Sequence, residues 1–295
     1  MQDLDYRQLT EFYSRSVSVM LEDMRKSDPR NDHVLNSNGY RGPEHGKVDI
    51  IAAGCSQTYG QGVQEKDTWP AILSKKLNMS YANIAIPGTS VQTIIQSVMN
   101  YIEMHGKPKV VAVLLPSLYR FTFVERTDIS TYKARRQVSD IPGISVYDMT
   151  MTPSGNSKDA VANWPKLSKQ PHDISKVLSY EAALYLSMMS INHLIHYCKV
   201  AEIQLVISSW YENADQILTE KKNRSWNVDF NCYVTIDKFE ELFNGSTPHV
   251  EGCHDNVDNH PYWDYGLDTA YHMGSHAHIH FAETFAKEIG GNSGQ

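Results

Sequence analysis

The sequence predicts an α/β fold built around a parallel β-sheet, and three observations support this prediction. The run 110–115, VVAVLL, is apolar at every position, and the run 48–53 is apolar everywhere except at Asp49. Short runs of this kind are typical of strands that are buried on both faces. The segments between the runs carry apolar residues at helical spacing. The resulting order of strand, helix, strand, helix, strand predicts parallel strands joined by right-handed crossovers.

The first half of this pattern contains three strands and two helices. Asp67 or Thr68 caps the first helix, whose first turn accommodates Pro70, and Ser90 caps the second. The sequence Lys107-Pro108-Lys109 ends the second helix. The elements expected here are a strand at 48–53, a helix from Pro70 to about Leu77, a strand at 81–86, a helix from Val91, and a strand at 110–115.

A long segment, 118–176, separates this half from the rest. It carries four prolines and several aromatic residues but no sustained hydrophobic period. Segments this long without regular structure are usually functional, and we interpret it as an ordered insertion that covers the edge where the strands end. The elements expected after it are a helix at 179–200, a strand at 204–208, a helix at 214–222, a short strand or helix within 230–243, and a last helix at 275–289.

The remaining domain prediction concerns the N-terminus. Apolar residues at helical spacing predict an amphipathic helix over about 6–26, ended by Asp28-Pro29. We therefore expect an N-terminal helical extension at 1–35 and a single α/β domain at 36–295, with the insertion at about 118–176. The length of 295 residues is enough for one large core.

Composition narrows the class of protein. Hydrophobic residues at 41% and charged residues at 21% are ordinary for a globular protein, and a net charge of -7 argues against general binding of nucleic acid. No apolar run approaches the roughly 20 residues of a membrane span, and no basic segment followed by an apolar one marks a signal peptide. The four cysteines are irregularly spaced. We expect no membrane partner and, by default, a cytoplasmic location.

Four places at predicted strand ends or before the last helix could carry chemistry. Ser56 follows the first strand between two glycines, Gly88 follows the second strand, and 116–120 follows the third. The segment 268–274 precedes the last helix. Open α/β sheets place their sites at the carboxyl ends of the strands. A nucleophilic serine needs a base, and N–H groups of glycine turns can stabilise an oxyanion, so these positions are compatible with a serine site. Taken alone, Ser56 fits a structural turn equally well.

The motif Gly54-Cys55-Ser56-Gln57-Thr58-Tyr59-Gly60 resembles the first sequence block of the SGNH or GDSL-type hydrolase family, with cysteine in place of aspartate. Its flanks, 38–42 and 67–70, resemble that family as well. The stretch 83–90 resembles the second block, and 272–274 with His278 resembles the last. The resemblance covers about residues 36–116 and 260–289.

This resemblance implies a three-layer α/β/α sandwich of flavodoxin-like outline and hydrolysis of an ester through an acyl-enzyme. It implies Ser56 as nucleophile, His272 as base, and the N–H groups of Ser56 and Gly88 as oxyanion donors. The substrate class that it suggests is a small-molecule or carbohydrate ester with a short acyl group, including O-acetyl groups. No cofactor or metal is expected, and the sequence leaves the oligomeric state open.

Two departures from the family pattern leave alternatives open. The asparagine of the third block is absent, so Ser117 or Arg120 stands in for it, or the oxyanion hole has two donors. The family's acid lies three residues before the histidine, where this chain has Thr269. Asp268 is the first candidate for the orienting acid and Asp264 the second, and a Ser-His dyad is the remaining possibility.

Two rival functions follow from other features. The missing asparagine and the displaced aspartate are compatible with a catalytically weak or inactive SGNH-like protein retained for binding or assembly. His272, His276 and His280 are spaced by four residues, which is compatible with a zinc-dependent hydrolase. The cluster lacks the H-E-x-x-H pattern, and buried or solvated histidines are the simpler interpretation.

Overall fold

The computed structural model describes nine ranges of the chain. They are 35–37, 40–44, 46–60, 63–126, 144–150, 180–210, 212–223, 230–236 and 274–291. The predicted helix at 6–26, most of the insertion, and the two predicted site residues Asp268 and His272 lie outside them.

The centre of the fold is a sheet of four parallel strands in the order β2-β1-β3-β6. These are β1 (Ile50–Gly54), β2 (Tyr81–Asn83), β3 (Val110–Leu115) and β6 (Gln204–Ser209). A parallel bridge between Ile207 and Tyr233 continues the sheet beyond β6. This order is that of flavodoxin-like folds, and it places the topological switch point between β1 and β3. The predicted parallel sheet is confirmed.

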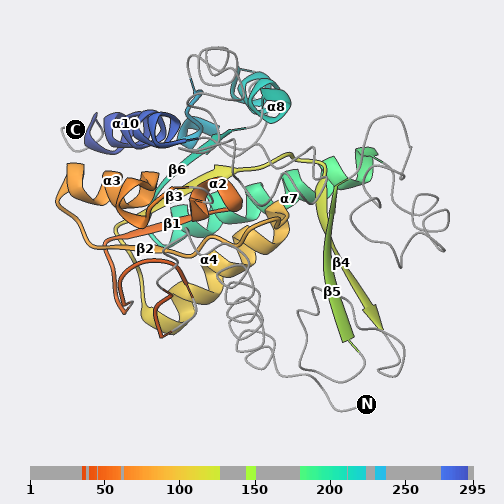
Figure 1. Cartoon of the computed structure of the whole chain (residues 1–295). Helices are drawn as coiled ribbons and strands as arrows, with labels where there is room; N and C mark the ends of the chain where they lie inside the picture. The colour runs from red at the N-terminus through yellow and green to blue at the C-terminus, as the bar shows by residue number, and fades with distance from the viewer. Residues whose placement is uncertain are drawn as a thin grey trace, which may run out of the picture.

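Alternate residues of the strands face two helical layers, as the pleat of a strand requires. One cluster holds Ile51 of β1 and Val111 of β3 with α4 (Val91–His105), α7 (Tyr180–Val200) and α8 (Glu212–Asn223). The other holds Ile50 and Val110 with α3 (Trp69–Leu77) and α10 (Ser275–Gly291). Figure 1 shows α3 and α10 side by side. The fold is therefore a three-layer α/β/α sandwich.

The caps predicted for two helices are confirmed. The hydroxyl of Thr68 accepts a hydrogen bond from the N–H of Ala71 at 3.5 Å, and that of Ser90 accepts one from Thr93 at 3.2 Å. Cys198 is buried in the core of the α7 side, as its place in an apolar helical pattern predicts. In the part of the chain that the structure describes, no helix is long and apolar enough to cross a bilayer.

The structure adds short elements that the sequence analysis did not predict. A helix of one turn, α2 (Ser56–Tyr59), follows β1, and η1 (Glu65–Asp67) is a 3-10 turn. The 3-10 turn η3 (Phe230–Cys232), by contrast, lies within 230–243, where a short strand or helix is predicted. The second strand ends at Asn83 and is therefore shorter than the predicted strand at 81–86. The chain still follows β1 to residue 86, since Ile86 donates its N–H to the carbonyl of Gly54 at 3.2 Å.

The insertion contains an antiparallel ribbon where the sequence showed no period. Its strands are β4 (Arg120–Arg126) and β5 (Ile144–Thr150), paired from Arg120 with Thr150 to Arg126 with Ile144. In Figure 1 this ribbon extends away from the sheet. The hydrophobic pattern of this segment did not reveal the two strands, and its role as a cover of the sheet edge stays a prediction.

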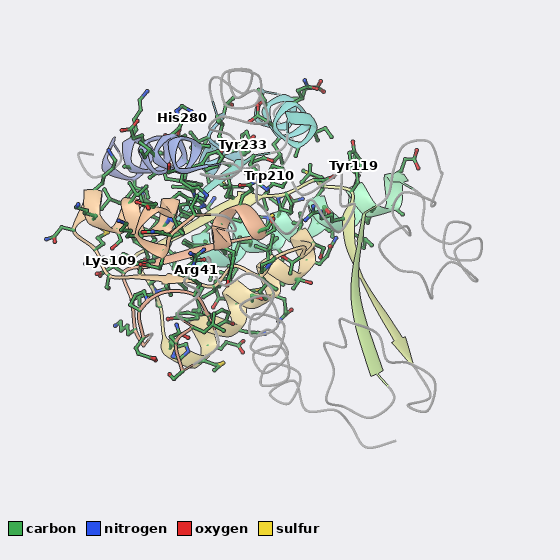
Figure 2. The ribbon with its side chains drawn as sticks, viewed as in Figure 1. Arg41, Lys109, Tyr119, Trp210, Tyr233 and His280 are labelled. Atoms are coloured by element: carbon green, nitrogen blue, oxygen red, sulfur yellow. The ribbon has the colours of Figure 1, made fainter. Side chains whose placement is uncertain are left out.

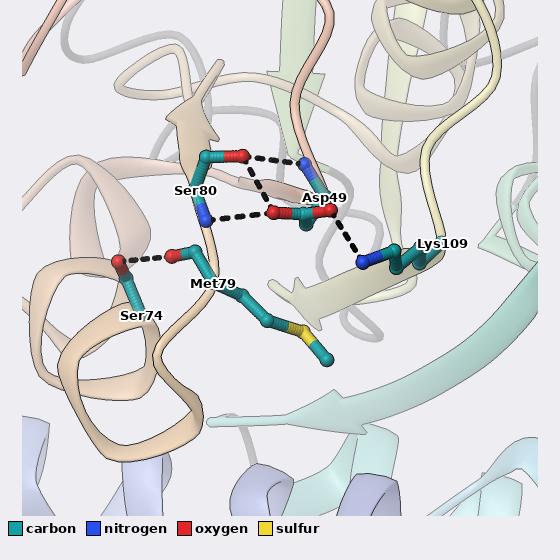
Figure 3. A network of polar contacts seen from close by, with 5 residues as sticks. All are labelled: Asp49, Ser74, Met79, Ser80 and Lys109. Carbon is teal, nitrogen blue, oxygen red and sulfur yellow. Dashed lines mark hydrogen bonds and ion pairs between the residues drawn. The ribbon is translucent and has the colours of Figure 1, made fainter.

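A polar network joins the starts of three strands at the amino edge of the sheet (Figure 3). The carboxylate of Asp49 accepts hydrogen bonds from the N–H and hydroxyl of Ser80 at 3.0 and 2.8 Å. The ammonium of Lys109 lies 2.9 Å from the other carboxylate oxygen. The hydrogen bond of Lys109, followed by those of Ser80, lowers the pKa of Asp49 to about 2. This network fastens the edge opposite to the candidate site.

Candidate functional site

Ser56 lies where β1 ends and the chain turns sharply into α2. It is the first residue of that helix, and 7% of it is exposed. A Cβ on Gly54 would lie 2.0 Å from the hydroxyl oxygen of Thr58 and 2.7 Å from the carbonyl oxygen of Leu114. Only glycine fits this close approach between the turn and β3. The tight geometry therefore fixes Ser56 at the carboxyl edge of the sheet, beside the switch point.

Arg41 holds the far end of the same turn. Its guanidinium is fully buried and donates to the carbonyl oxygen of Tyr59 at 3.0 Å, to that of Gly60, and to that of Val63 at 2.6 Å. The guanidinium also lies over the ring of Tyr59, 5.2 Å from its centroid. Gly60 ends α2 with a φ of 79°, a conformation that glycine adopts without strain. Arg41 thereby satisfies carbonyl groups that a short helix leaves open.

Asn83 connects the second motif block to the first. Its side-chain amide donates to the carbonyl oxygen of Thr58 at 3.0 Å, and its amide oxygen accepts the N–H of Ala85 at 3.2 Å. The residue is almost fully buried. Its amide is thus engaged in holding α2 and the 83–88 segment together.

Gly88 lies in the turn that follows this segment and has a φ of 76°. The next residue, Thr89, donates its hydroxyl to the carbonyl oxygen of Ile86 at 2.8 Å. The carbonyl oxygen of Thr89 accepts a hydrogen bond from the guanidinium of Arg120 at 3.5 Å. The structure therefore brings together two predicted site residues, Gly88 and Arg120, at one edge of the sheet.

Ser117 lies in the turn after β3, and Arg120 is the first residue of β4, which follows that turn. The hydroxyl of Ser117 accepts the N–H of Tyr119 at 3.3 Å, and its carbonyl accepts the N–H of Arg120 at 3.3 Å. Ser187 of α7 donates its hydroxyl to the carbonyl of Leu118 at 2.6 Å. Ser117 is buried and Arg120 is half-buried, so only Arg120 presents a substantial exposed surface.

Cys55 and Trp210 meet next to the serine. The indole N–H of Trp210 donates to the sulfur of Cys55 at 3.3 Å, and the hydroxyl of Ser56 lies 3.9 Å from that sulfur. Trp210 follows β6 directly, at the same edge of the sheet. Figure 2 shows Trp210 and Tyr119 on the side where the strands end, with Lys109 on the opposite side.

The start of α10 lies at this edge as well. The side chain of Gln204, at the beginning of β6, donates to the carbonyl of Ile289 near the end of α10, at 3.4 Å. The other end of α10 therefore points to the carboxyl edge, where His278 accepts the N–H of Trp69 at 3.1 Å. His278 is fully buried, so it joins α10 to α3.

His272 and Asp268 lie outside the described residues, and their predicted roles stay predictions. Within the described ranges, no group of three or more His, Cys, Asp or Glu side chains is arranged to hold a metal ion. Of the histidines in the zinc alternative, only His280 has a described side chain, and it is half-buried on α10.

Sequence reasoning did not assign a site role to Arg41, Asn83 or Trp210. Arg41 stands in the flank of the first motif and Asn83 in the second block. Their roles could not be predicted, because they bind carbonyl groups of α2, a helix that the sequence did not reveal. Trp210 had a usable signal, because it stands two residues after the predicted strand at 204–208, and the ends of parallel strands meet at one edge.

No protein-family model matches the chain, and no curated protein matches it. Solved structures do match over most of its length. One is described as a lipolytic protein of the G-D-S-L family from Desulfitobacterium hafniense DCB-2, at 12% identity and a TM-score of 0.41, covering 81% of this chain and 97% of that chain.

Two further matches are carbohydrate esterases. A family 2 enzyme with a carbohydrate binding domain, from Corynascus thermopiles (Myceliophthora fergusii), has 15% identity and a TM-score of 0.38, covering 87% of this chain and 70% of that chain. A carbohydrate esterase with divergent catalytic and non-catalytic binding functions in its active site has 14% identity and a TM-score of 0.35, covering 86% and 68%. At these values, the function has to be inferred from the residues of this chain.

The residues of the candidate site lie together at one edge of the sheet. The ends of four neighbouring strands, or the segments that follow them, supply Ser56, Gly88, Ser117, Arg120 and Trp210. The start of α10 lies beside them. This is the edge at which open α/β folds bind their ligands.

Proposed function

We propose that this protein is a serine hydrolase that cleaves carboxylic esters, with Ser56 as its nucleophile. The observation that carries the proposal is the turn around Ser56. Ser56 follows the central strand β1 after one residue, in a turn that only glycine at position 54 permits, and buried side chains of Arg41 and Asn83 fix that turn. A nucleophile has to be held in one place at the strand ends, and this turn meets that requirement.

The base in this proposal is His272. It stands three residues before Ser275, the first residue of α10, and this closeness in sequence supports the choice. The start of α10 lies at the edge that carries Ser56. Asp268 orients the imidazole in our proposal and stabilises the imidazolium that forms during the reaction.

The proposed reaction has two halves. Ser56 Oγ attacks the ester carbonyl carbon while His272 takes the hydroxyl proton, and the N–H groups of Ser56 and Gly88 stabilise the oxyanion. The imidazolium then gives the proton to the leaving alcohol, which leaves an acyl group on Ser56. Water, deprotonated by His272, attacks this acyl-enzyme and releases the acid.

Arg120 is the proposed substrate contact. It is half-buried beside the Gly88 turn, and a guanidinium there can donate to a hydroxyl or carbonyl oxygen of the alcohol portion. Short acyl esters are the substrate class to test, with O-acetylated carbohydrates as the first natural candidates.

A fluorophosphonate probe tests the nucleophile. We expect the unmodified protein to be labelled and to hydrolyse p-nitrophenyl acetate, and we expect Ser56→Ala to abolish both. Ser190→Ala, which removes an exposed serine hydroxyl on α7, is the matched control and should keep both activities. A folded protein that is neither labelled nor active would refute the hydrolase and favour the binding alternative.

His272→Ala should lower kcat by at least about 10³-fold, since the base of such a site acts as a unit with the nucleophile. Metal analysis of the purified protein, with and without a chelator, separates this proposal from a zinc hydrolase. Loss of turnover on chelation and its return with zinc would contradict a metal-free mechanism.

A further inference from the structure

The sulfur of Cys55 stands between an indole and the proposed nucleophile. The N–H of Trp210 donates to this sulfur at 3.3 Å, and the hydroxyl of Ser56 donates to it at 3.9 Å. Cys55 is fully buried. The chain thus has a sulfur-centred contact at the residue where the related motif has an aspartate.

Trp210 is held firmly by the end of β3. Its backbone N–H donates to the carbonyl oxygen of Leu115 at 3.3 Å, and the hydroxyl of Ser209 donates to the same oxygen at 3.0 Å. Its side chain packs against the core on the α3 and α10 side. The contact with Cys55 therefore connects the serine turn after β1 to the end of β6.

A cysteine side chain suits this fully buried position better than the aspartate of the related motif. A carboxylate that is fully removed from water needs hydrogen bonds or a countercharge, whereas a thiol can be buried at little cost. Sulfur is a weak acceptor, but a contact that water cannot reach does not compete with solvent.

We propose that Cys55 and Trp210 form a positioning pair for Ser56. The indole N–H fixes the sulfur, and the sulfur holds the Ser56 hydroxyl in one rotamer until the base takes its proton. This inference rests on the proposed hydrolase function. It assigns to the chain a device in which a neutral thiol and an indole together orient the nucleophile.

Kinetics of four variants test the pair. Cys55→Ala and Trp210→Phe should each lower kcat for p-nitrophenyl acetate by about 3- to 10-fold, the size of one weak hydrogen bond, with little change in KM. The double variant should be no slower than the slower single variant, because either change already removes the contact. Cys55→Ser, which keeps an acceptor, should recover part of the rate.

Cys198→Ala is the matched control. It removes another buried cysteine, on α7 and remote from Ser56, so it should lower thermal stability without lowering kcat. Unchanged kcat in both single variants, or single losses that multiply in the double variant, would overturn the positioning pair.

The indole resonance gives a readout that needs no turnover. The chain has five tryptophans, and the indole cross-peak that Trp210→Phe removes from the ¹H–¹⁵N spectrum belongs to Trp210. This peak should shift in Cys55→Ala and stay in place in Cys198→Ala. A peak that stays in place in Cys55→Ala would overturn the positioning pair and leave the proposed hydrolase function standing. Absence of turnover and labelling in the unmodified protein would overturn the hydrolase and the positioning role with it.

Discussion

The backbone N–H of Trp69 donates a hydrogen bond to Nδ1 of His278 at 3.1 Å, across 209 residues of sequence. Both residues are fully buried. Trp69 is the first residue of α3, where a helix has N–H groups without carbonyl partners, so His278 caps α3 from the neighbouring helix. An imidazole nitrogen that accepts carries no proton, so the neutral ring of His278 is protonated on Nε2.

His278→Ala should therefore lower the unfolding free energy by about 1–3 kcal/mol, because it leaves the N–H of Trp69 buried without its acceptor. It should also lower kcat, since α10 leads back to the proposed base. Urea denaturation measures the first effect. His280→Ala, two residues along α10 and half-buried, is the control, and an equal loss in both variants would contradict the cap.

Arg41→Met should destabilise the protein by at least about 2 kcal/mol, because three carbonyl groups at the end of α2 lose a charged donor. Arg41→Lys should recover little, since an ammonium cannot reproduce the planar fork of the guanidinium. Lys75→Met makes the same loss of charge and the same final side chain on the exposed face of α3, and should change stability by less than about 0.5 kcal/mol. Denaturant midpoints that coincide for Arg41→Met and Lys75→Met would disprove the clamp.

Gly54→Ala should cost about 1–3 kcal/mol and slow fluorophosphonate labelling, because the new methyl group overlaps Thr58 and the carbonyl of Leu114. Adding Thr58→Ala should relieve only part of this loss, since the backbone oxygen of Leu114 stays 2.7 Å away. Gly46→Ala meets no atom within 4 Å and serves as control. Wild-type labelling of Gly54→Ala would show that the turn tolerates a side chain.

The carboxylate of Asp49 should stabilise the folded protein at pH values above the range in which it takes up a proton. The pKa of Asp49 is about 2 in the folded state, below the ordinary value of an unfolded aspartate near 3.9, so its stabilising effect is present above about pH 4 and fades as the pH falls toward 2. Asp49→Asn should lower the denaturation midpoint at pH 7, and the difference from the unmodified protein should shrink between pH 4 and pH 2.5.

Glu202→Gln is the control for this titration. Its carboxylate is 90% exposed and lies 3.8 Å from Lys107, and surface pairs of this kind contribute little. A difference for Asp49→Asn that stays constant with pH would indicate that the charge of Asp49 is not what stabilises the amino edge.

The sequence by itself determined the sheet and its helices. Continuous apolar runs such as 110–115 identify strands that are buried on both faces, and the caps Thr68 and Ser90 locate the helix starts, because these are local properties of the chain. The motif from Gly54 to Gly60 likewise identified Ser56 and its place at a strand end. Continuous apolar runs and helix capping depend on a few neighbouring residues, so they can be recognised without the fold.

Only the tertiary structure decided what surrounds Ser56. Three contacts there join residues that are far apart in the sequence. Arg41 and Tyr59 are 18 positions apart, Cys55 and Trp210 are 155 apart, and Trp69 and His278 are 209 apart. Such contacts depend on which strand ends become neighbours in the β2-β1-β3-β6 order, and hydrophobic periodicity carries no information about that order. The ribbon of β4 and β5 escaped detection for a related reason, because its pairing partners are separated by a segment without any local signal.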